Sequence, residues 1–372
     1  MDFEPTAEAT EAADLAATIL ADHTTPERLR AVDAEGERFD RALWTALSEA
    51  GLVALTVPED HDGSGLGLVE LCRVLVEVGR TVAPVPLGTH AVTALAISQF
   101  GSRAQQARWL PEAASGGSVL TTALSEDRAF APAEPVTRAE NDGSSWLLTG
   151  AKVVVPAGTL AGLFVVPAST AEGVTVFLVH ADDPGVVVTP QRVSDGDVVG
   201  RLELDRTAVP MDRVLGGIGG GAEVIEWLTQ RLTVAVCAQQ LGTLEGAMTL
   251  TSSYAKTREQ FGRPIGTFQA VSQRLADGYI DVLGARLTMW QAAWKLSEGL
   301  PADADVAIAK LWAADAGHQV AHTTVHVHGG VGIDLDGEAH RYFTAAKRHE
   351  FTLGGTTDQA RALGALLAHE PA

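Results

Sequence analysis

The sequence predicts an α+β protein in which a helical N-terminal domain, a middle antiparallel β-domain and a C-terminal helical bundle follow one another. Apolar residues are spaced as in helices over residues 6–116 and again after the glycine cluster 216–221. Between these regions, short β-branched runs alternate with turn residues, as is typical of a small antiparallel sheet. We therefore expect domains at residues 1–117, 118–217 and 218–372.

Each part of this division depends on a particular repeat. Helical steps of three or four residues appear in two sets, which are Leu68, Leu71, Leu75 and Val78 in the first part and Val224, Leu228, Leu232 and Val236 in the last. The β-branched runs of the middle part cover residues 146–148, 152–155, 163–166, 174–179, 186–188 and 201–204.

Composition limits the possible partners and location. The chain has 372 residues, of which 46% are hydrophobic, so it can bury several cores. Its net charge of -20 disfavours nucleic acid and anionic membrane as partners. Cys72 and Cys237 are too few for a disulfide framework. Without an export signal or a long apolar run, the sequence predicts a cytoplasmic protein.

The most specific motif is YAKTREQFGRPIGTFQAV at residues 254–271. The planar guanidinium of Arg258 suits a pyrophosphate, Phe261 offers an apolar face to a nucleotide, and the Gln269 amide suits ribose or phosphate oxygens. The segment can thus hold a dinucleotide. Alternatively, Arg258 is a solvated helix end and Phe261 is core packing.

This segment resembles the C-terminal helical domain of acyl-CoA dehydrogenases. Residues 51–67 resemble the family's N-terminal loop, and residues 327–332 resemble its late glycine turn. The likeness therefore covers nearly the whole chain and implies the acyl-CoA dehydrogenase fold. It also implies FAD as cofactor and α,β-dehydrogenation of an acyl-CoA thioester as the reaction.

The late glycine turn adds further candidate cofactor contacts. Gly329 and Gly330 let the backbone approach a ligand, and the resemblance implies that they meet the adenosine half of FAD. The family usually has glutamine at the position of His326, where imidazole can still donate a hydrogen bond. The spacing of His322, His326 and His328 does not match a metal ligand set, so we expect no metal.

The resemblance also shows what the sequence lacks. The family removes a proton with a glutamate just before a Gly-Thr pair, and Gly354 occupies that position here. The family's other placement, immediately before an arginine on the first C-terminal helix, is Gln230 before Arg231. Glycine has no side chain and a glutamine amide cannot accept the proton, so we expect no catalytic residue in this chain.

The flavin half of the site is weakened as well. Family members usually carry a tryptophan and a threonine on the strand that corresponds to residues 152–158, where this chain has Val154 and Pro156. In family dimers, the neighbouring subunit grips the dinucleotide half of each FAD. A chain that keeps only this half is expected to serve a homologous catalytic subunit in a heteromeric, α2β2 complex and to be inactive alone.

The likeness is strongest to the non-catalytic subunit of heterotetrameric acyl-CoA dehydrogenases of actinobacterial steroid side-chain degradation, which implies a steroid-CoA substrate. The alternative is a self-sufficient dehydrogenase with a displaced base, for which Glu226 is the candidate because it lies one helical turn before Gln230. An ordinary solvated or capping glutamate is the simpler explanation of Glu226, since a base displaced by one turn would require a repositioned substrate. A flavin-containing nucleic-acid binder of the same fold is disfavoured by the charge.

Overall fold

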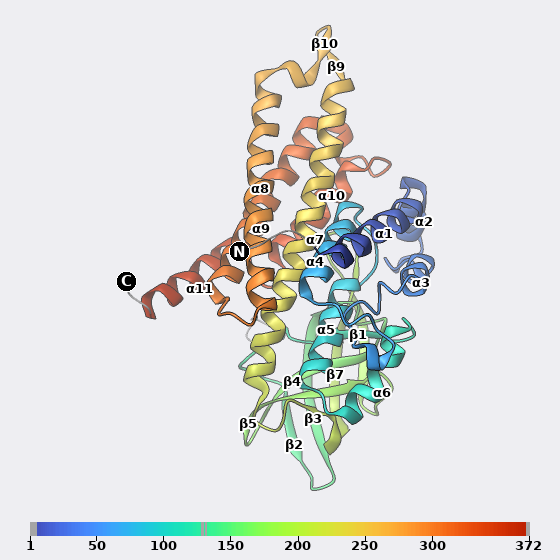
Figure 1. Cartoon of the computed structure of the whole chain (residues 1–372), viewed down its shortest axis with the longest axis vertical. Helices are drawn as coiled ribbons and strands as arrows, with labels where there is room; N and C mark the ends of the chain where they lie inside the picture. The colour runs from blue at the N-terminus through green and yellow to red at the C-terminus, as the bar shows by residue number, and fades with distance from the viewer. Residues whose placement is uncertain (1–5, 128–129, 131, 370–372) are drawn as a thin grey trace. The chain divides into compact units, whose positions relative to one another are not determined.

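The computed structural model describes residues 6–127, 130 and 132–369 and contains two compact units. The helical unit comprises the described residues up to Ala34, Leu68–Ala83 and the residues from Thr233 onward. The sheet unit comprises Glu35–Gly67 and Pro84–Leu232. The predicted α+β class, with helices before and after a sheet, is confirmed (Figure 1).

The helical unit is built from long helices and one small hairpin. Its helices are α1 (Ala7–His23), α2 (Pro26–Ala34), α4 (Leu68–Arg80), the later turns of α7 (Gly221–Thr257), α8 (Gln269–Ser297), α9 (Asp303–His328), α10 (Ala339–Phe351) and α11 (Thr356–His369). The hairpin strands β9 (Glu259–Gln260) and β10 (Arg263–Pro264) and the 3-10 turn η3 (Ile265–Thr267) connect α7 to α8, and the 3-10 turn η4 (Gly329–Ile333) follows α9.

Helices α4 and α7 approach each other backbone to backbone. A Cβ atom added to Gly242 would lie 1.8 Å from the Val76 carbonyl oxygen, and one added to Gly79 would lie 2.0 Å from the Gln239 carbonyl oxygen. The Thr243 hydroxyl also donates to the carbonyl oxygen of Gly79 at 3.3 Å. Because no side chain fits between the backbones, this crossing requires glycine on both helices.

A buried lysine closes the C-terminus of α10. Lys310 is fully buried, and its Nζ donates to the carbonyl oxygens of His349 at 2.8 Å and Glu350 at 3.0 Å. These carbonyls belong to the last turn of the helix, where no backbone donor follows. Burial lowers the pKa of Lys310 to about 8. Cys72 and Cys237 are free and buried in the same unit.

The sheet unit contains α3 (Arg41–Glu49), η1 (Glu59–His61), α5 (Leu87–Phe100), α6 (Arg103–Ala114) and the main sheet. The strands are β1 (Val119–Thr122), β2 (Arg138–Asn141), β3 (Ser145–Val155), β4 (Ala161–Thr170), β5 (Gly173–His180), β6 (Val186–Arg192), β7 (Val198–Pro210) and, after the 3-10 turn η2 (Met211–Arg213), β8 (Val214–Leu215). Their order is β6-β7-β3-β2-β4-β5-β8, with β1 beside β4.

The sheet is mainly antiparallel, but β4 pairs in parallel with β1 and, through Ser169, with Arg138 at the start of β2. The runs 146–148 and 152–155, separate in the sequence, belong to the single strand β3, because irregularities in its pairing with β7 let it continue past Gly150. The buried face of the sheet includes Trp146, Phe164 and Phe177.

A buried ion pair fastens a loop to β3. Lys152 is completely buried, and its Nζ donates to Glu126 Oε1 at 2.7 Å. Burial opposes ionisation of Glu126, but hydrogen bonds from Lys152 and from the hydroxyl and backbone N–H of Thr137 hold its pKa at about 2. The loop that carries Glu126 is therefore fixed to the strand.

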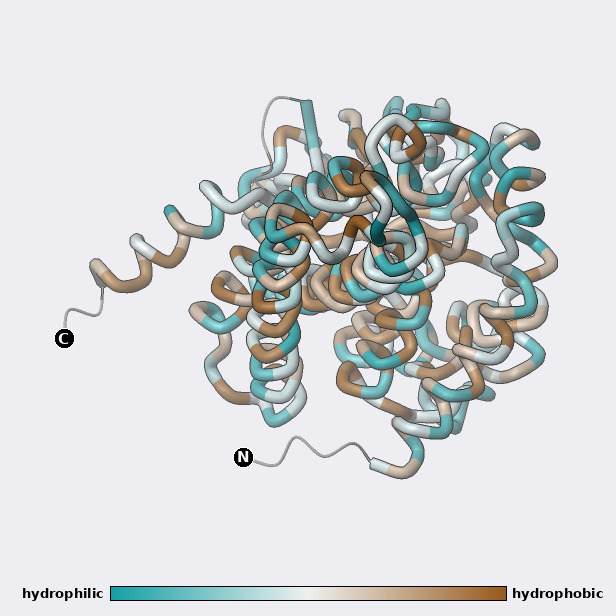
Figure 2. Tube along the Cα trace, turned by 90° about the horizontal axis from the view of Figure 1, so that it is seen from above, coloured by the Kyte–Doolittle hydropathy of each residue, from teal (hydrophilic) through white to brown (hydrophobic). Residues whose placement is uncertain are grey.

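Hydrophilic and hydrophobic residues are interspersed along many of the helices (Figure 2). Within the described part of the chain, none of the helices has the length and apolar character needed to cross a membrane.

Candidate functional site

The hairpin after α7 presents Phe261 to solvent. Phe261 and Gly262 form the two-residue loop of this hairpin. Their φ angles are +55° and +76°, and positive φ at both positions is typical of the tight turn in such loops. Positive φ is unfavourable for a bulky residue, and residues with such backbone strain cluster at active sites and ligand-binding sites. Phe261 is 92% exposed, so its interpretation as core packing is wrong.

Arg258 lies between α7 and this hairpin. Its backbone N–H donates to the Tyr254 carbonyl oxygen at 2.8 Å, and its own carbonyl oxygen accepts from the Ile265 N–H at 2.8 Å. The backbone is thus held from both sides, while the side chain is exposed and the guanidinium has no hydrogen-bond or ion-pair partner among the described residues. It is available to an external anion.

Gln269 is the first residue of α8 and is exposed. The free N–H groups and the dipole of a helix N-terminus favour an anion at this place. Together with Arg258 and Phe261, the start of α8 offers charge, an apolar face and backbone donors along one short segment. These groups fit the adenosine and pyrophosphate part of a dinucleotide.

The glycine turn follows the end of α9. Gly329 ends the helix with a φ of +66°, and a Cβ atom added to Gly329 or Gly330 would meet no atom within 4 Å. His326 is exposed in the last helical turn. The rings of Tyr254 and His328 are stacked with centroids 4.4 Å apart. The base of the hairpin and the glycine turn therefore lie at the same end of the helical unit.

Gly354, which the sequence predicts to occupy the position of a catalytic base, lies in a turn shaped for glycine. Gly354 lies between α10 and α11 with a φ of +95°, and a Cβ atom there would lie 2.9 Å from Gln359 Nε2. Gln359 Nε2 donates to the Leu353 carbonyl oxygen at 3.0 Å, and the Gly355 N–H donates to Asp358 Oδ2 at 2.9 Å. Both bonds hold the turn in its present conformation.

Gln230, predicted from the sequence to occupy the second base position, lies in the sheet unit on the first turns of α7. Gln230 is half-buried there, and the next residue, Arg231, lies over the Trp227 ring at 3.8 Å. Burial lowers the pKa of Arg231 to about 10. Glu226, the candidate displaced base, is exposed one turn earlier. Of these side chains, only Glu226 can accept a proton at neutral pH.

The strand segment expected to contact flavin offers few donors. The Val154 N–H donates to Gln191 Oε1 at 2.9 Å, at a φ of +52° that is unusual for a β-branched residue. Pro156 has no N–H, and its carbonyl oxygen accepts from the Thr121 hydroxyl at 2.5 Å. Gln191 had no signal in the sequence, because its contact with Val154 depends on the pairing of distant strands.

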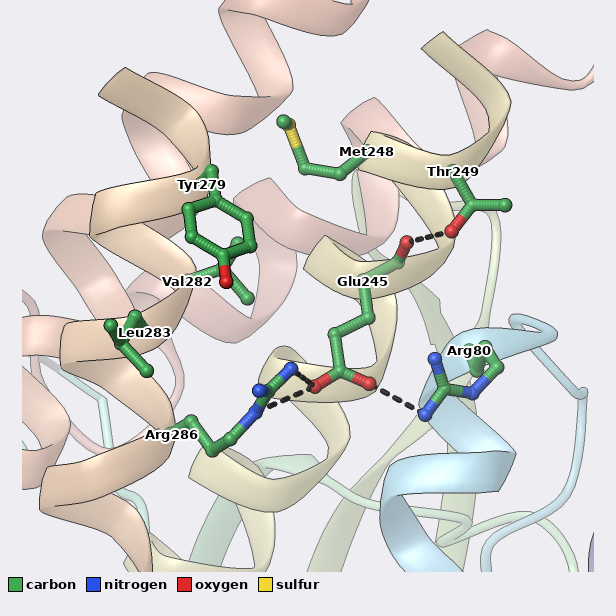
Figure 3. Close-up of a pocket in the computed structure, with 8 residues that line it drawn as sticks. All are labelled: Arg80, Glu245, Met248, Thr249, Tyr279, Val282, Leu283 and Arg286. Atoms are coloured by element: carbon green, nitrogen blue, oxygen red, sulfur yellow. Dashed lines mark hydrogen bonds and ion pairs between the residues drawn. The ribbon is translucent and has the colours of Figure 1, made fainter. Parts of the chain in front are cut away.

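A separate pocket of about 220 Å³ lies between α4, α7 and α8 (Figure 3). Glu245 accepts from Arg286 at 2.6 Å and pairs with Arg80 at 2.5 Å, while Tyr279 and Leu283 supply an apolar wall. Glu77 also pairs with Arg80, so the carboxylates of Glu245 and Glu77 together balance the two guanidiniums and the pocket has little to attract an anion. Among the residues with described positions, no group of His, Cys, Asp or Glu side chains is arranged to hold a metal.

Comparison with known proteins defines the class. Residues 6–117 match the family model for the acyl-CoA dehydrogenase N-terminal domain, and residues 219–365 match the model for the C-terminal domain. The chain belongs to the acyl-CoA dehydrogenase family, whose members are FAD-dependent oxidoreductases. The predicted fold and cofactor class are thereby confirmed.

Particular relatives cover the entire chain or nearly so. Acyl-CoA dehydrogenase FadE27 of Mycobacterium tuberculosis is 46% identical over 381 residues, with 100% of both chains covered. A chain in the crystal structure of the ChsE4-ChsE5 complex from Mycobacterium tuberculosis is 47% identical with a TM-score of 0.95, again over 100% of both chains. A chain in the structure of a variant of the Tcur3481-Tcur3483 steroid ACAD is 42% identical with a TM-score of 0.92, over 98% of each chain.

Proposed function

We propose that this chain is the FAD-binding, base-free subunit of a heteromeric acyl-CoA dehydrogenase, in which it completes the FAD site of a homologous catalytic subunit. One observation carries the proposal: the usual base position is Gly354, whose φ of +95° disfavours any side chain. The other position holds Gln230, which cannot accept a proton. The carboxylate must then come from the partner.

The hydrogen-bond donors that are available in this chain suggest which half of FAD each subunit binds. The side chains of Arg258, Phe261 and Gln269 are exposed and therefore available to an FAD bound at the interface with the partner. We call these three residues the nucleotide grip. They bind and orient the pyrophosphate and adenosine, supported by His326, Gly329 and Gly330. Bound FAD supplies the hydride acceptor for the dehydrogenation. Val154 and Pro156 lack free donors for the flavin ring, so the partner provides that half of the site.

The comparisons support the partner and the substrate class. The ChsE4-ChsE5 and Tcur3481-Tcur3483 structures are each named for two components, and the second is described as a steroid ACAD, an acyl-CoA dehydrogenase. From the family resemblance we further infer an α2β2 heterotetramer that oxidises a steroid side-chain CoA ester, in which this subunit is inactive alone. The cytoplasmic location and the domain limits at residues 117 and 217 stay predictions.

The self-sufficient alternative depends on Glu226. This carboxylate is exposed, and it lies one helical turn, roughly 6 Å, away from the family position at Gln230. A base displaced by that distance requires a substrate held in a different place. The simpler explanation is a solvated glutamate near the start of α7.

Counting flavins tests the proposal. In the co-expressed complex, we expect one FAD per heterodimer, because only the interface that joins this chain's Arg258 to the partner's flavin half is complete. Glu226→Gln in this chain should leave turnover within a few-fold. Removal of the partner's glutamate should lower kcat by about 10²–10⁴-fold. One flavin per polypeptide, or a large loss of turnover from Glu226→Gln, would contradict the proposal.

A further inference from the structure

Two aromatic side chains join the segments that form the proposed nucleotide grip. Tyr254 is on the last turns of α7, and His328 is the last residue of α9. Their rings are nearly parallel, with an interplanar angle of 21° and centroids 4.4 Å apart. Both side chains are half-buried, so one side of the pair is packed against the unit while the other reaches its surface.

Hydrogen bonds fix this stack from below. His328 Nδ1 lies 2.8 Å from the Thr324 carbonyl oxygen, and because a carbonyl can only accept, Nδ1 carries the proton. The Thr324 hydroxyl in turn lies 3.2 Å from that of Thr251 on α7 and is completely buried. The imidazole therefore has a fixed orientation. Two contacts join the ends of α7 and α9, namely the ring stack and the hydrogen bond between Thr251 and Thr324.

The stack lies directly beneath the residues that the proposed function needs. Tyr254 precedes Arg258 by four residues, so both lie on the same face of the chain as α7 ends, and the Arg258 N–H donates to the Tyr254 carbonyl oxygen. His328 immediately precedes Gly329, where the backbone turns to a positive φ. A shift of either ring moves the guanidinium or the glycine turn relative to the other.

We propose that Tyr254 and His328 are positioning residues that hold the Arg258 hairpin and the Gly329–Gly330 turn in the arrangement that binds the adenosine-pyrophosphate part of FAD. The inference rests on the proposed function. Neither side chain needs to touch the cofactor. Their effect is to fix two ligand-binding segments before the ligand arrives, which lowers the entropic cost of binding.

The test uses the heteromeric complex from which FAD has been removed. The affinity for FAD is measured by titration with flavin fluorescence as the signal. The affinity for ADP is measured in the same way by competition, because ADP represents the nucleotide half of FAD alone. Tyr254→Leu removes the stack and should weaken FAD and ADP by the same factor, on the order of 3- to 10-fold, the size expected for one aromatic contact. His328→Leu, which removes the same stack from α9, should do likewise. Tyr254→Phe keeps the ring and should bind both ligands as the parent does.

A matched control comes from the same helix. The His322 ring contacts Phe343 edge-on at 5.3 Å, away from the glycine turn in sequence, so His322→Leu should leave both affinities unchanged. Melting temperature is recorded for every variant. If both Leu variants melt earlier but bind FAD and ADP as the parent does, the stack has only a structural role and the inference is wrong.

A further variant separates this failure from failure of the proposed function. Arg258→Ala should weaken FAD whether or not the stack matters. If Arg258→Ala loses affinity while Tyr254→Leu and His328→Leu do not, only the positioning role is overturned. If Arg258→Ala also binds FAD normally, the nucleotide grip itself is misassigned and both proposals fail.

Discussion

Gly354 lies in the turn between α10 and α11 with a φ of +95°, and a side chain there would contact Gln359 and Asp358. We expect Gly354→Ala to lower the free energy of unfolding by about 1–3 kcal/mol, because an L-residue is strained in this conformation. Gly364→Ala on α11 is the control: an added Cβ there meets no atom within 4 Å, and the variant should be neutral or slightly stabilised.

Thermal or chemical denaturation of the two alanine variants checks this difference. Gly354→Glu should be destabilised as well and should not make the isolated chain a dehydrogenase, since a glutamate in a strained turn is not held over a substrate. Turnover by that variant alone would contradict this account of the missing base.

Arg258 carries the charge of the proposed nucleotide grip. A buried, charge-assisted contact to pyrophosphate contributes roughly 1.5–3 kcal/mol, so Arg258→Ala should weaken FAD by about 10- to 100-fold. Arg258→Lys should also lose affinity, because an ammonium cannot form the planar two-bond contact. Lys256→Ala, which removes an exposed charge two residues away, should have little effect. Equilibrium dialysis of FAD measures all three.

Lys310 makes stability depend on pH in the alkaline range. Burial lowers its pKa from the ordinary 10.5 to about 8 in the folded protein. Between these values, the unfolded chain binds a proton that the folded chain does not, so the free energy of unfolding rises with pH. Below about pH 8 both states are protonated, and the full cost of the buried charge is present.

Comparison with Lys310→Met isolates this effect. From about pH 8 to pH 10 the stability of the parent should rise by about 1–3 kcal/mol relative to the variant. Urea denaturation at the two pH values tests it. A constant difference between the two proteins would mean that Lys310 stays protonated in its contacts with His349 and Glu350.

At the scale of the elements, the crossing of α4 and α7 depends on glycines that no side chain can replace. In Gly242→Ala, the new methyl group would overlap the Val76 carbonyl, and in Gly79→Ala it would overlap the Gln239 carbonyl. In each variant the free energy of unfolding should fall by about 1–3 kcal/mol, because the helices must move apart and the hydrogen bond from Thr243 to Gly79 is lost.

Gly364→Ala again serves as the control for a glycine in an open helical position. Denaturant midpoints of the three variants give the comparison. Equal stability of Gly242→Ala and Gly364→Ala would show that the two backbones do not approach as closely as described.

At the scale of the whole molecule, the exposed apolar side chains bear on the proposed partner subunit. Phe261, Tyr279, Ile280, Leu287 and Leu335 each expose more than half of their surface. Three of them, Tyr279, Ile280 and Leu287, lie on α8, and a contiguous exposed apolar patch usually marks an interface. We expect the chain expressed alone to be aggregated or poor in flavin, and co-expression with the catalytic subunit to restore a flavin-containing complex. A yellow homotetramer with full flavin content and dehydrogenase turnover would contradict this expectation.

Much of the fold could be predicted from local patterns. Apolar residues at helical spacing predicted α4 and α7, and β-branched runs predicted β3–β7, because periodicity reflects which side of an element is buried. The parallel pairing of β1 with β4 could not be predicted in this way. Pairing depends on which strands meet in three dimensions, and residues 119 and 161 are far apart in the sequence.

The sequence by itself determined the family, and it predicts that no base occupies the two family positions, because the identities of Gly354 and Gln230 do not depend on conformation. Only the tertiary structure decided that Phe261 is exposed on a strained turn, that Gln191 engages the Val154 N–H, and that Tyr254 stacks on His328. The last two contacts join residues separated by tens of positions. Their energies depend on distances and orientations that are set when helices and strands pack, and local sequence does not encode such distances.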